Sequence, residues 1–422
     1  MADVQIASGS SINYYMNTQL AGGIVWVTKT LGYMFYLDGG AAGGDVVYKK
    51  TTDGGATWGS PVDVTTGYSV SCLHVYHDKW TRNVATNLIH VAYIDSTSDD
   101  VKYRNLDPDN SDALSAEKQV LDGTTSSVYT TTWTQKWVNV VRAEGGYIYV
   151  LGYIDANQTE KVFAVSTDGG ANFASKAVPA PAGATITPFA ILVPGDETDT
   201  NDIGCVYWDC NNNKLVWCVY DQSGDSWSTA DISATTFAEY TGGINFAAAQ
   251  MQSDGAIYVV AMTQFDNVAA DFKVFKITGN AGAGYTYTEK TDVWTNEAEH
   301  GFAGIFINQQ TDDIYAVYMG GSAALSSVGV KYKKSTDGAG TWGAEQSFSA
   351  DADDDLRGVW AGQSANGTGG RFQPAWFNDD LNRLLTNYDN GIEIGAEAPA
   401  SAACTDCRTG RLGWLYPGRV SM

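Results

Sequence analysis

Tyr48-Lys-Lys-Thr-Thr-Asp53-Gly54-Gly55-Ala-Thr-Trp58 is the stretch from which the architecture of this chain can be inferred, because the chain repeats it. A second copy runs over residues 163–173 and a third over residues 332–342. A fourth stretch, residues 220–227, keeps the order aromatic, hydroxyl, aspartate, tryptophan, but its loop is three residues shorter. Aspartate followed by glycine favours a tight turn, so each copy predicts a strand that ends in a bend.

Two landmarks give the repeat the same period. The leading aromatic residue recurs every 55 to 60 residues, at Tyr48, Tyr103, Phe163, Tyr220, Phe275, Tyr332 and Tyr388. A second, three-residue pattern lies upstream of the first and recurs every 54 to 60 residues. It begins with an aromatic or apolar residue and in most copies ends with a polar one. The last residues of its seven copies are Asp38, Asp95, Asp155, Asp209, Gln264, Gly320 and Asn378. The chain therefore contains seven units of similar size.

Within a unit, apolar runs of four to eight residues alternate with turn clusters, which predicts an antiparallel sheet of about four strands. Such a sheet has two faces to bury, so neighbouring sheets must stack on each other. We predict an all-β, seven-bladed β-propeller of four-stranded antiparallel blades, with six blades as the alternative.

The repeat also divides the chain. Residues 22–390 form the propeller. The seventh unit has no evident fourth strand, so residues 1–21 are a candidate closing strand that joins the first blade to the last. Residues 391–422 form a tail that is either another closing strand or a docking segment.

Composition limits the partners. The formal net charge is −23, which argues against nucleic acid, because a polyanion would be repelled. Of the 48 acidic residues, 37 are aspartate, a residue of turns and caps. The sequence lacks both a long apolar run and the basic, then apolar, start of an export signal, so we expect no membrane insertion and no Sec signal peptide.

The pattern Ser/Thr-x-Asp-x-Gly-x-x-Trp/Phe resembles the Asp-box repeat of sialidase-type β-propellers and their many non-enzymatic relatives. Residues 51–58 and 166–173 match it fully, whereas residues 335–342 carry Ala339 in place of the glycine. The resemblance implies that the box holds a turn, on the face opposite the functional pocket. The residues to which it assigns this structural role are Asp53, Gly55, Trp58, Asp168, Gly170, Phe173, Asp225, Trp227, Asp337 and Trp342.

The sequence shows no clear pattern of catalytic residues. Sialidases hold a carboxylate with three arginines and use a tyrosine–glutamate pair, but no arginine precedes Arg82 and the nine arginines show no matching spacing. A glycosidase built on two aspartates stays open. No catalytic residue is assigned, and a sialidase-like glycoside hydrolase is the alternative function.

Metal ligands are also not assigned. Cys72, His74 and His77 lie close in sequence, but on a strand the first two face one way and the third the other. Cys404 and Cys407 form a lone C-x-x-C without two further ligands nearby, so a disulfide, a free pair and a site shared between subunits stay open.

The upstream pattern places polar residues around one mouth of the propeller. The candidates for this binding face are Asp38, Asp95, Asp155, Asp209 and Asn378. Two interpretations apply: each residue caps its own turn, or together they form an electronegative rim for cations such as Ca²⁺ or for a basic partner. No cofactor is otherwise expected.

The tail combines arginine with aromatic residues, a composition typical of interfaces. Its docking candidates are Arg408, Arg411, Trp414, Tyr416 and Arg419. Together with the intact repeats, this favours a non-enzymatic binding or structural propeller. We expect it on a virion, as a phage capsid decoration or tail component, or on another extracellular assembly, with other subunits of that assembly and surface glycans as partners. A soluble propeller lectin is the third possibility.

Overall fold

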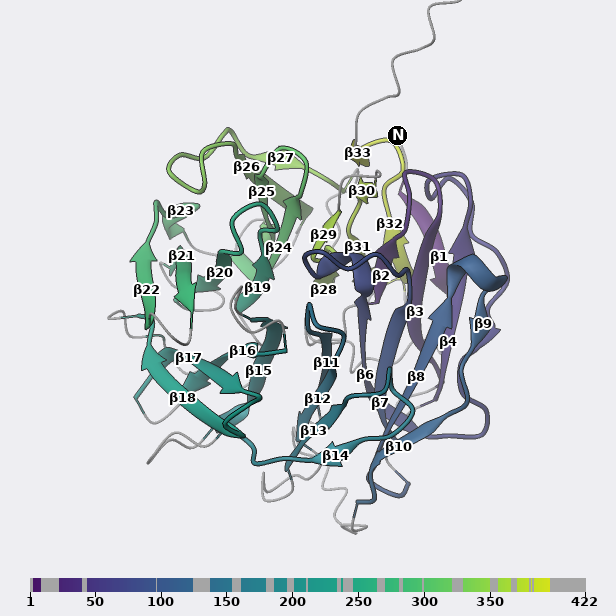
Figure 1. Ribbon diagram of the computed structural model, residues 1–422. Coiled ribbons are helices and arrows are strands. Elements are labelled where there is room, and N and C mark those ends of the chain that lie inside the picture. Colours follow the sequence, from purple (N-terminus) through teal and green to yellow (C-terminus); the bar gives the residue numbers. More distant parts are fainter. Residues whose placement is uncertain are drawn as a thin grey trace, which may run out of the picture.

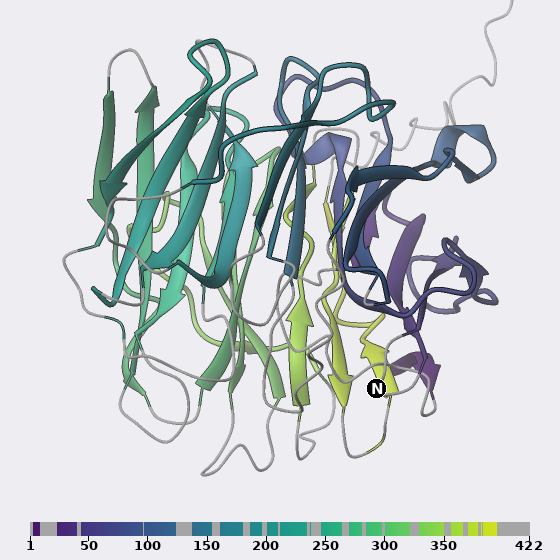
Figure 2. The ribbon, with the colours of Figure 1, turned by 90° about the horizontal axis from the view of Figure 1, so that it is seen from below.

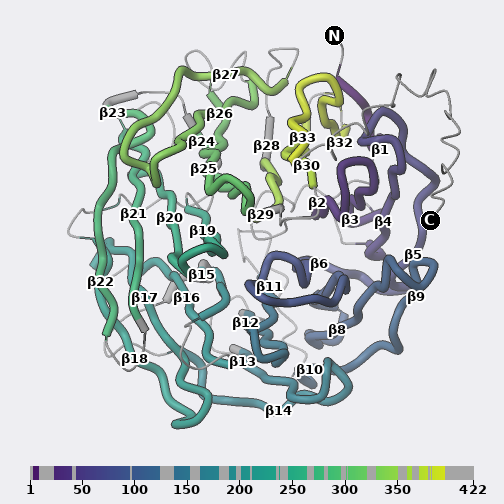
Figure 3. The backbone as a smooth tube through the Cα atoms, turned by 45° about the horizontal axis from the view of Figure 1, so that its top comes forward, coloured from purple at the N-terminus to yellow at the C-terminus, as the bar shows by residue number. Residues whose placement is uncertain are grey.

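The protein is a ring of seven four-stranded antiparallel sheets, as Figures 1 and 3 show. This confirms the predicted seven-bladed β-propeller and excludes the six-bladed alternative. The computed structural model describes residues 3–8, 23–39, 44–95, 97–123, 137–153, 161–179, 186–195, 201–209, 212–233, 237, 246–263, 270–280, 284–297, 300–320, 329–349, 356–365, 370–378, 381 and 383–394.

The first four blades follow one another along the chain. Blade 1 contains β2 (Ile24–Trp26), β3 (Gly32–Asp38), β4 (Asp45–Thr51) and β5 (Val62–Asp63). Blade 2 contains β6 (Val70–His77), β7 (Ile89–Asp95), β8 (Asp100–Asp107) and β10 (Lys118–Leu121), with β9 (Ala113–Leu114) also on β8. Blade 3 contains β11 (Trp137–Arg142), β12 (Ile148–Tyr153), β13 (Lys161–Ser166) and β14 (Ala174–Ser175). Blade 4 contains β15 (Ile186–Pro194), β16 (Ile203–Asp209), β17 (Lys214–Asp221) and β18 (Ser226–Asp231).

Blades 5 and 6 each have one extra strand, whereas blade 7 has four strands. Blade 5 contains β19 (Phe246–Gln250), β20 (Ile257–Met262), β21 (Ala270–Asn280) and β22 (Gly284–Glu289), with β23 (Trp294–Glu297) also on β21. Blade 6 contains β24 (His300–Asn308), β25 (Asp313–Gly320), β26 (Gly329–Ser335) and β27 (Gln346–Ser347), and β29 (Ser364–Ala365) runs parallel to β24. Blade 7 contains β28 (Leu356–Trp360), β31 (Ala375–Asn378), β32 (Arg383–Thr386) and β1 (Val4–Ser8).

The two ends of the propeller sequence meet in blade 7. The N-terminal strand β1 pairs antiparallel with β32, with Val4 opposite Thr386 and Ser8 opposite Arg383, and Figure 1 shows the purple and yellow strands side by side. Beside this blade, β30 (Gly370–Phe372) pairs with β33 (Ile392–Ile394). The outer strand of the last blade thus comes from the N-terminal segment, and residues 392–394 belong to the folded body.

The core lies between the blades. The middle strands are packed on both faces and are apolar on both, as in β7, where every residue is buried. Outer strands such as β22 are largely exposed. Figure 2 shows the blades from below. In the described ranges the helical segments are η2 (Asp78–Trp80) and η3 (Pro108–Asn110), and no helix there is long and apolar enough to cross a membrane.

Candidate functional site

The repeated aspartates accept hydrogen bonds inside their own loops. In blade 1, Thr51 Oγ1 donates to Asp53 (2.8 Å), while the backbone N–H and the hydroxyl of Thr57 donate to its two carboxylate oxygens (3.0 and 2.6 Å). The Gly55 N–H donates to Thr51 Oγ1 (2.9 Å). The carboxylate and the hydroxyl therefore satisfy donors that the turn would otherwise leave unpaired.

The loops of blades 3 and 6 have the same hydrogen bonds. Asp168 accepts from the side chain and backbone of Asn172, and Asp337 accepts from the backbone and side chain of Thr341. These hydrogen bonds lower the pKa of both carboxyl groups to about 2, because they favour the charged form. Ala339 adopts the left-handed conformation (φ +63°) that glycine has in the other two loops.

These loops also contact the preceding blade. The ring of Phe173 packs edge-on against Tyr103 of blade 2 (5.2 Å between centroids), and Trp342 Nε1 donates to the Thr291 carbonyl, which follows blade 5's outer strand (2.8 Å). The shortened loop of blade 4 acts similarly, since Trp227 Nε1 donates to the Ala177 carbonyl (2.7 Å) and Asp225 pairs with Lys176 (2.8 Å). The loops thus connect neighbouring blades.

The binding-face candidates lie at equivalent positions, at the ends of second strands. Asp38, Asp95, Asp209 and Asn378 each face the first residue of the next strand, on the face opposite the repeated loops. Asp155 lies outside the described residues, as does Gln264.

Three of the four described candidates accept hydrogen bonds from their own turns. Asp95 accepts from the Thr97 N–H (3.0 Å), Asp209 from the side chain of Asn212 (2.6 Å), and Asn378 from the Leu381 N–H (2.8 Å). Asp38 is exposed. Within the described ranges, no group of three or more histidine, cysteine or acidic residues is placed to hold a metal ion.

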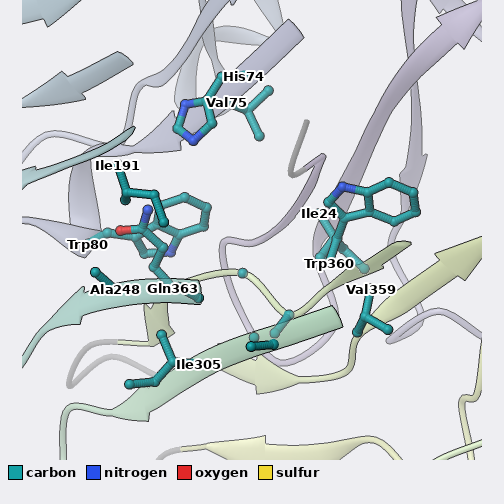
Figure 4. A pocket seen from close by; sticks show the side chains of 15 residues that line it. Ile24, His74, Val75, Trp80, Ile191, Ala248, Ile305, Val359, Trp360 and Gln363 are labelled. Carbon is teal, nitrogen blue, oxygen red and sulfur yellow. The ribbon is translucent and has the colours of Figure 1, made fainter. Parts of the chain in front are cut away.

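A cavity of about 70 Å³ lies on the propeller axis, between the first strands of six blades (Figure 4). Its walls include Ile191 of β15, Ala248 of β19, Ile305 of β24 and Val359 of β28. Its polar side chains are His74 of β6 and Gln363, and Trp80 of η2 adds an indole ring. The cavity is therefore mostly apolar, with few polar groups.

The axis is closed at the end where the repeated loops lie. There β29 pairs with the end of β24, and Gln363 accepts a backbone hydrogen bond from Ile307 (3.0 Å). From the opposite side of the ring, Gln252 Nε2 donates to the Lys79 carbonyl in η2 (2.8 Å). These contacts form a floor beneath the cavity.

The imidazole of His74 is held in one orientation. Its Nδ1 accepts a hydrogen bond from the Val140 N–H of blade 3 (3.2 Å), and 5% of the residue is exposed. Burial lowers its pKa to about 3, so the ring is neutral at pH 7 and carries its hydrogen on Nε2. In the described part of the chain no group bonds to Nε2, and Figure 4 shows the ring at the cavity wall.

A charged cluster joins blades 2 and 3 below this site. Asp78 is fully buried and bonds to His90 Nε2 (2.7 Å) and Arg142 (2.8 Å), while His90 Nδ1 bonds to the Tyr103 hydroxyl (2.6 Å). Burial alone would raise the pKa of Asp78, but His90 and Arg142 together lower it well below its usual range. Because Asp78, His90 and Tyr103 are buried, they are not positioned to meet a substrate, and the bond from Asp78 to Arg142 links blade 2 to blade 3.

A tyrosine–glutamate pair is also present, but in the wrong place for catalysis. Tyr93 donates to Glu117, which also bonds to Tyr68 (2.8 Å) and Lys102 (3.4 Å). Tyr93 is completely buried in the sheet of blade 2, away from the axis. The pair therefore lacks the access that a nucleophile needs.

Sequence reasoning did not find the axial cavity, and it had no signal to use. The lining residues come from different blades, and only one of them, His74, stands out in the sequence, beside Cys72 and His77. In the structure Cys72 is buried, His74 lines the cavity and His77 bonds to Asn87 (2.8 Å). Cys404, Cys407 and the docking candidates Arg408, Arg411, Trp414, Tyr416 and Arg419 lie outside the described residues.

Comparison with known proteins shows the fold. No family model matches this chain, and neither does any curated protein sequence. An ulvan lyase from a family of polysaccharide lyases is similar with a TM-score of 0.54 and 12% identity, over 91% of this chain and 94% of that one. The NanB sialidase from Streptococcus pneumoniae has a TM-score of 0.49 and 9% identity, over 75% and 66% of the two chains. An α-L-arabinofuranosidase from Fusarium graminearum has a TM-score of 0.46 and 11% identity, over 76% and 93%. At 12% identity, the similarity to the ulvan lyase concerns the fold alone.

Proposed function

We propose that this chain is a non-enzymatic binding and structural β-propeller, that its three repeated loops are Asp boxes with a structural role, and that it binds glycans. One observation carries the proposal. The repeated polar residues, from Asp53, Asp168 and Asp337 on one face to Asp95 and Asp209 on the other, accept hydrogen bonds from their own turns. Side chains used in this way shape turns, which is the structural role that we propose for them.

The setting we propose is a larger extracellular assembly, such as a phage capsid or tail. The acidic composition and the arginine-rich, aromatic tail support this setting. Deleting residues 408–422 tests the tail: a stable monomer that no longer assembles supports docking, whereas an unfolded product contradicts it.

Glycan cleavage is the competing function, because the ulvan lyase has the same fold. A panel of fluorogenic glycosides together with uronate-containing polysaccharides tests for turnover, and a glycan array tests for binding. We expect binding without turnover. Turnover that survives purification to homogeneity would contradict the proposal.

A further inference from the structure

The axial cavity has a hydrogen-bond donor without a partner. His74 is more than nine-tenths buried, its Nδ1 is occupied by the Val140 N–H, and its Nε2–H has no partner among the described residues. A ligand atom that accepts this hydrogen inside the cavity would give the Nε2–H a hydrogen-bond partner. The donor therefore indicates a site for an acceptor group.

The walls determine the charge of that group. None of the fifteen lining residues in the described part of the chain is an arginine, a lysine or a carboxylate, and His74 is neutral. An anion or a cation would lose its hydration here without gaining an opposite charge. The group is therefore uncharged, with an apolar part against Ala248 and Ile305.

Gln363 adds the second polar contact. Its side-chain amide lines the same cavity and offers both an acceptor oxygen and a donor N–H. A carboxamide matches this pair, because its carbonyl accepts from His74 and its N–H donates to Gln363. Its methyl group is small enough for a cavity of about 70 Å³.

We propose that the axial cavity binds a small uncharged carboxamide group, either free or as the acetamido group of a sugar. His74 supplies the donor, Gln363 the acceptor, and Ala248 and Ile305 the apolar wall. The inference rests on the cavity and not on the proposed function, so a negative glycan array leaves it intact.

The test is a titration of the full-length chain, labelled with ¹⁵N-histidine, with acetamide. The chain has four histidines, so the signals of the other three serve as internal controls. We expect a saturable shift of the His74 signals with acetamide and none with acetate. N-acetylglucosamine, compared with glucose, shows whether a sugar-borne acetamido group reaches the cavity, and binding of either amide supports the site.

Two variants address the cavity directly. Ala248→Leu fills it without touching the bond between His74 and Val140, and we expect acetamide affinity to fall at least tenfold. Val62→Leu changes an exposed outer residue by one methylene and should bind like the parent. Unmoved His74 signals, equal binding of acetate and acetamide, or full affinity in Ala248→Leu would each overturn the proposal.

Discussion

Blades 1, 3 and 6 hold their outer edges differently from blades 4 and 5. In the first group the outer strands β5, β14 and β27 have two residues each, and a hydrogen-bonded aspartate loop precedes each strand. In the second group the outer strands β18 and β22 have six residues each. A long backbone ladder and a compact loop of side-chain bonds are therefore alternative ways to complete a blade.

Both kinds of blade reach the preceding blade near the turn between the third and fourth strands. In blade 5, which lacks an aspartate loop, Tyr285 packs on Trp217 of blade 4 (5.7 Å between centroids). In blade 2, Asp112 pairs with Lys50 of blade 1 (2.7 Å). What the blades share is the contact between neighbours, and the aspartate loop is one means of making it.

The largest loss of stability is expected in blade 4, which has a six-residue outer strand and a closely packed core. The ring of Trp217 in β17 lies over Gly204 of β16, and a Cβ there would be 1.8 Å from the ring. Gly204→Ala should therefore lower the free energy of unfolding by about 3 kcal/mol, because the buried ring must move. Urea unfolding followed by tryptophan fluorescence measures the change.

Gly67→Ala is the matched control for Gly204→Ala. Gly67 has φ +80° and no atom within 4 Å of the added Cβ, so only the left-handed backbone is penalised, by about 1 kcal/mol. If both variants lose the same stability, close packing in blade 4 is not the cause.

The loop of blade 3 offers an internal comparison between adjacent glycines. Gly169 and Gly170 both have positive φ, but a Cβ on Gly170 would be 2.4 Å from the Tyr103 ring, whereas Gly169 has nothing within 4 Å. We expect Gly170→Ala to cost about 2–3 kcal/mol and Gly169→Ala about 1 kcal/mol. Thermal unfolding of the two variants measures the difference, and equal losses would show that the loop does not clasp blade 2.

The sequence was sufficient to predict the blades but not the cavity. Seven blades followed from the spacing of Tyr48 and its six counterparts, since the side chains of one repeat are local and periodic. The cavity depends on His74 of blade 2, Ala248 of blade 5 and Gln363 of the segment between β28 and β29, and these residues carry no periodic signal. The Nε2–H of His74 points into the cavity because Nδ1 on the other side of the ring accepts a hydrogen bond from the Val140 N–H. That contact is made by the backbone of the neighbouring blade, so no pattern of residue types indicates it.

The smallest effect concerns the charge of the loop aspartates, and it depends on pH. The pKa values of Asp168 and Asp337 are lowered to about 2 by hydrogen bonds from Asn172 and Thr341, respectively, compared with about 4 in an unfolded chain. A lowered pKa contributes stability that is present above pH 4 and is lost as the pH falls towards 2. Asp168→Asn and Asp337→Asn should therefore melt at a lower temperature than the parent at pH 6. This difference in melting temperature should become smaller between pH 4 and pH 2.5. Asp63→Asn, an exposed change in β5 outside the loops, should melt like the parent throughout. A difference in melting temperature that does not change with pH would mean that these loops depend on the shape of the aspartate side chain and not on its charge.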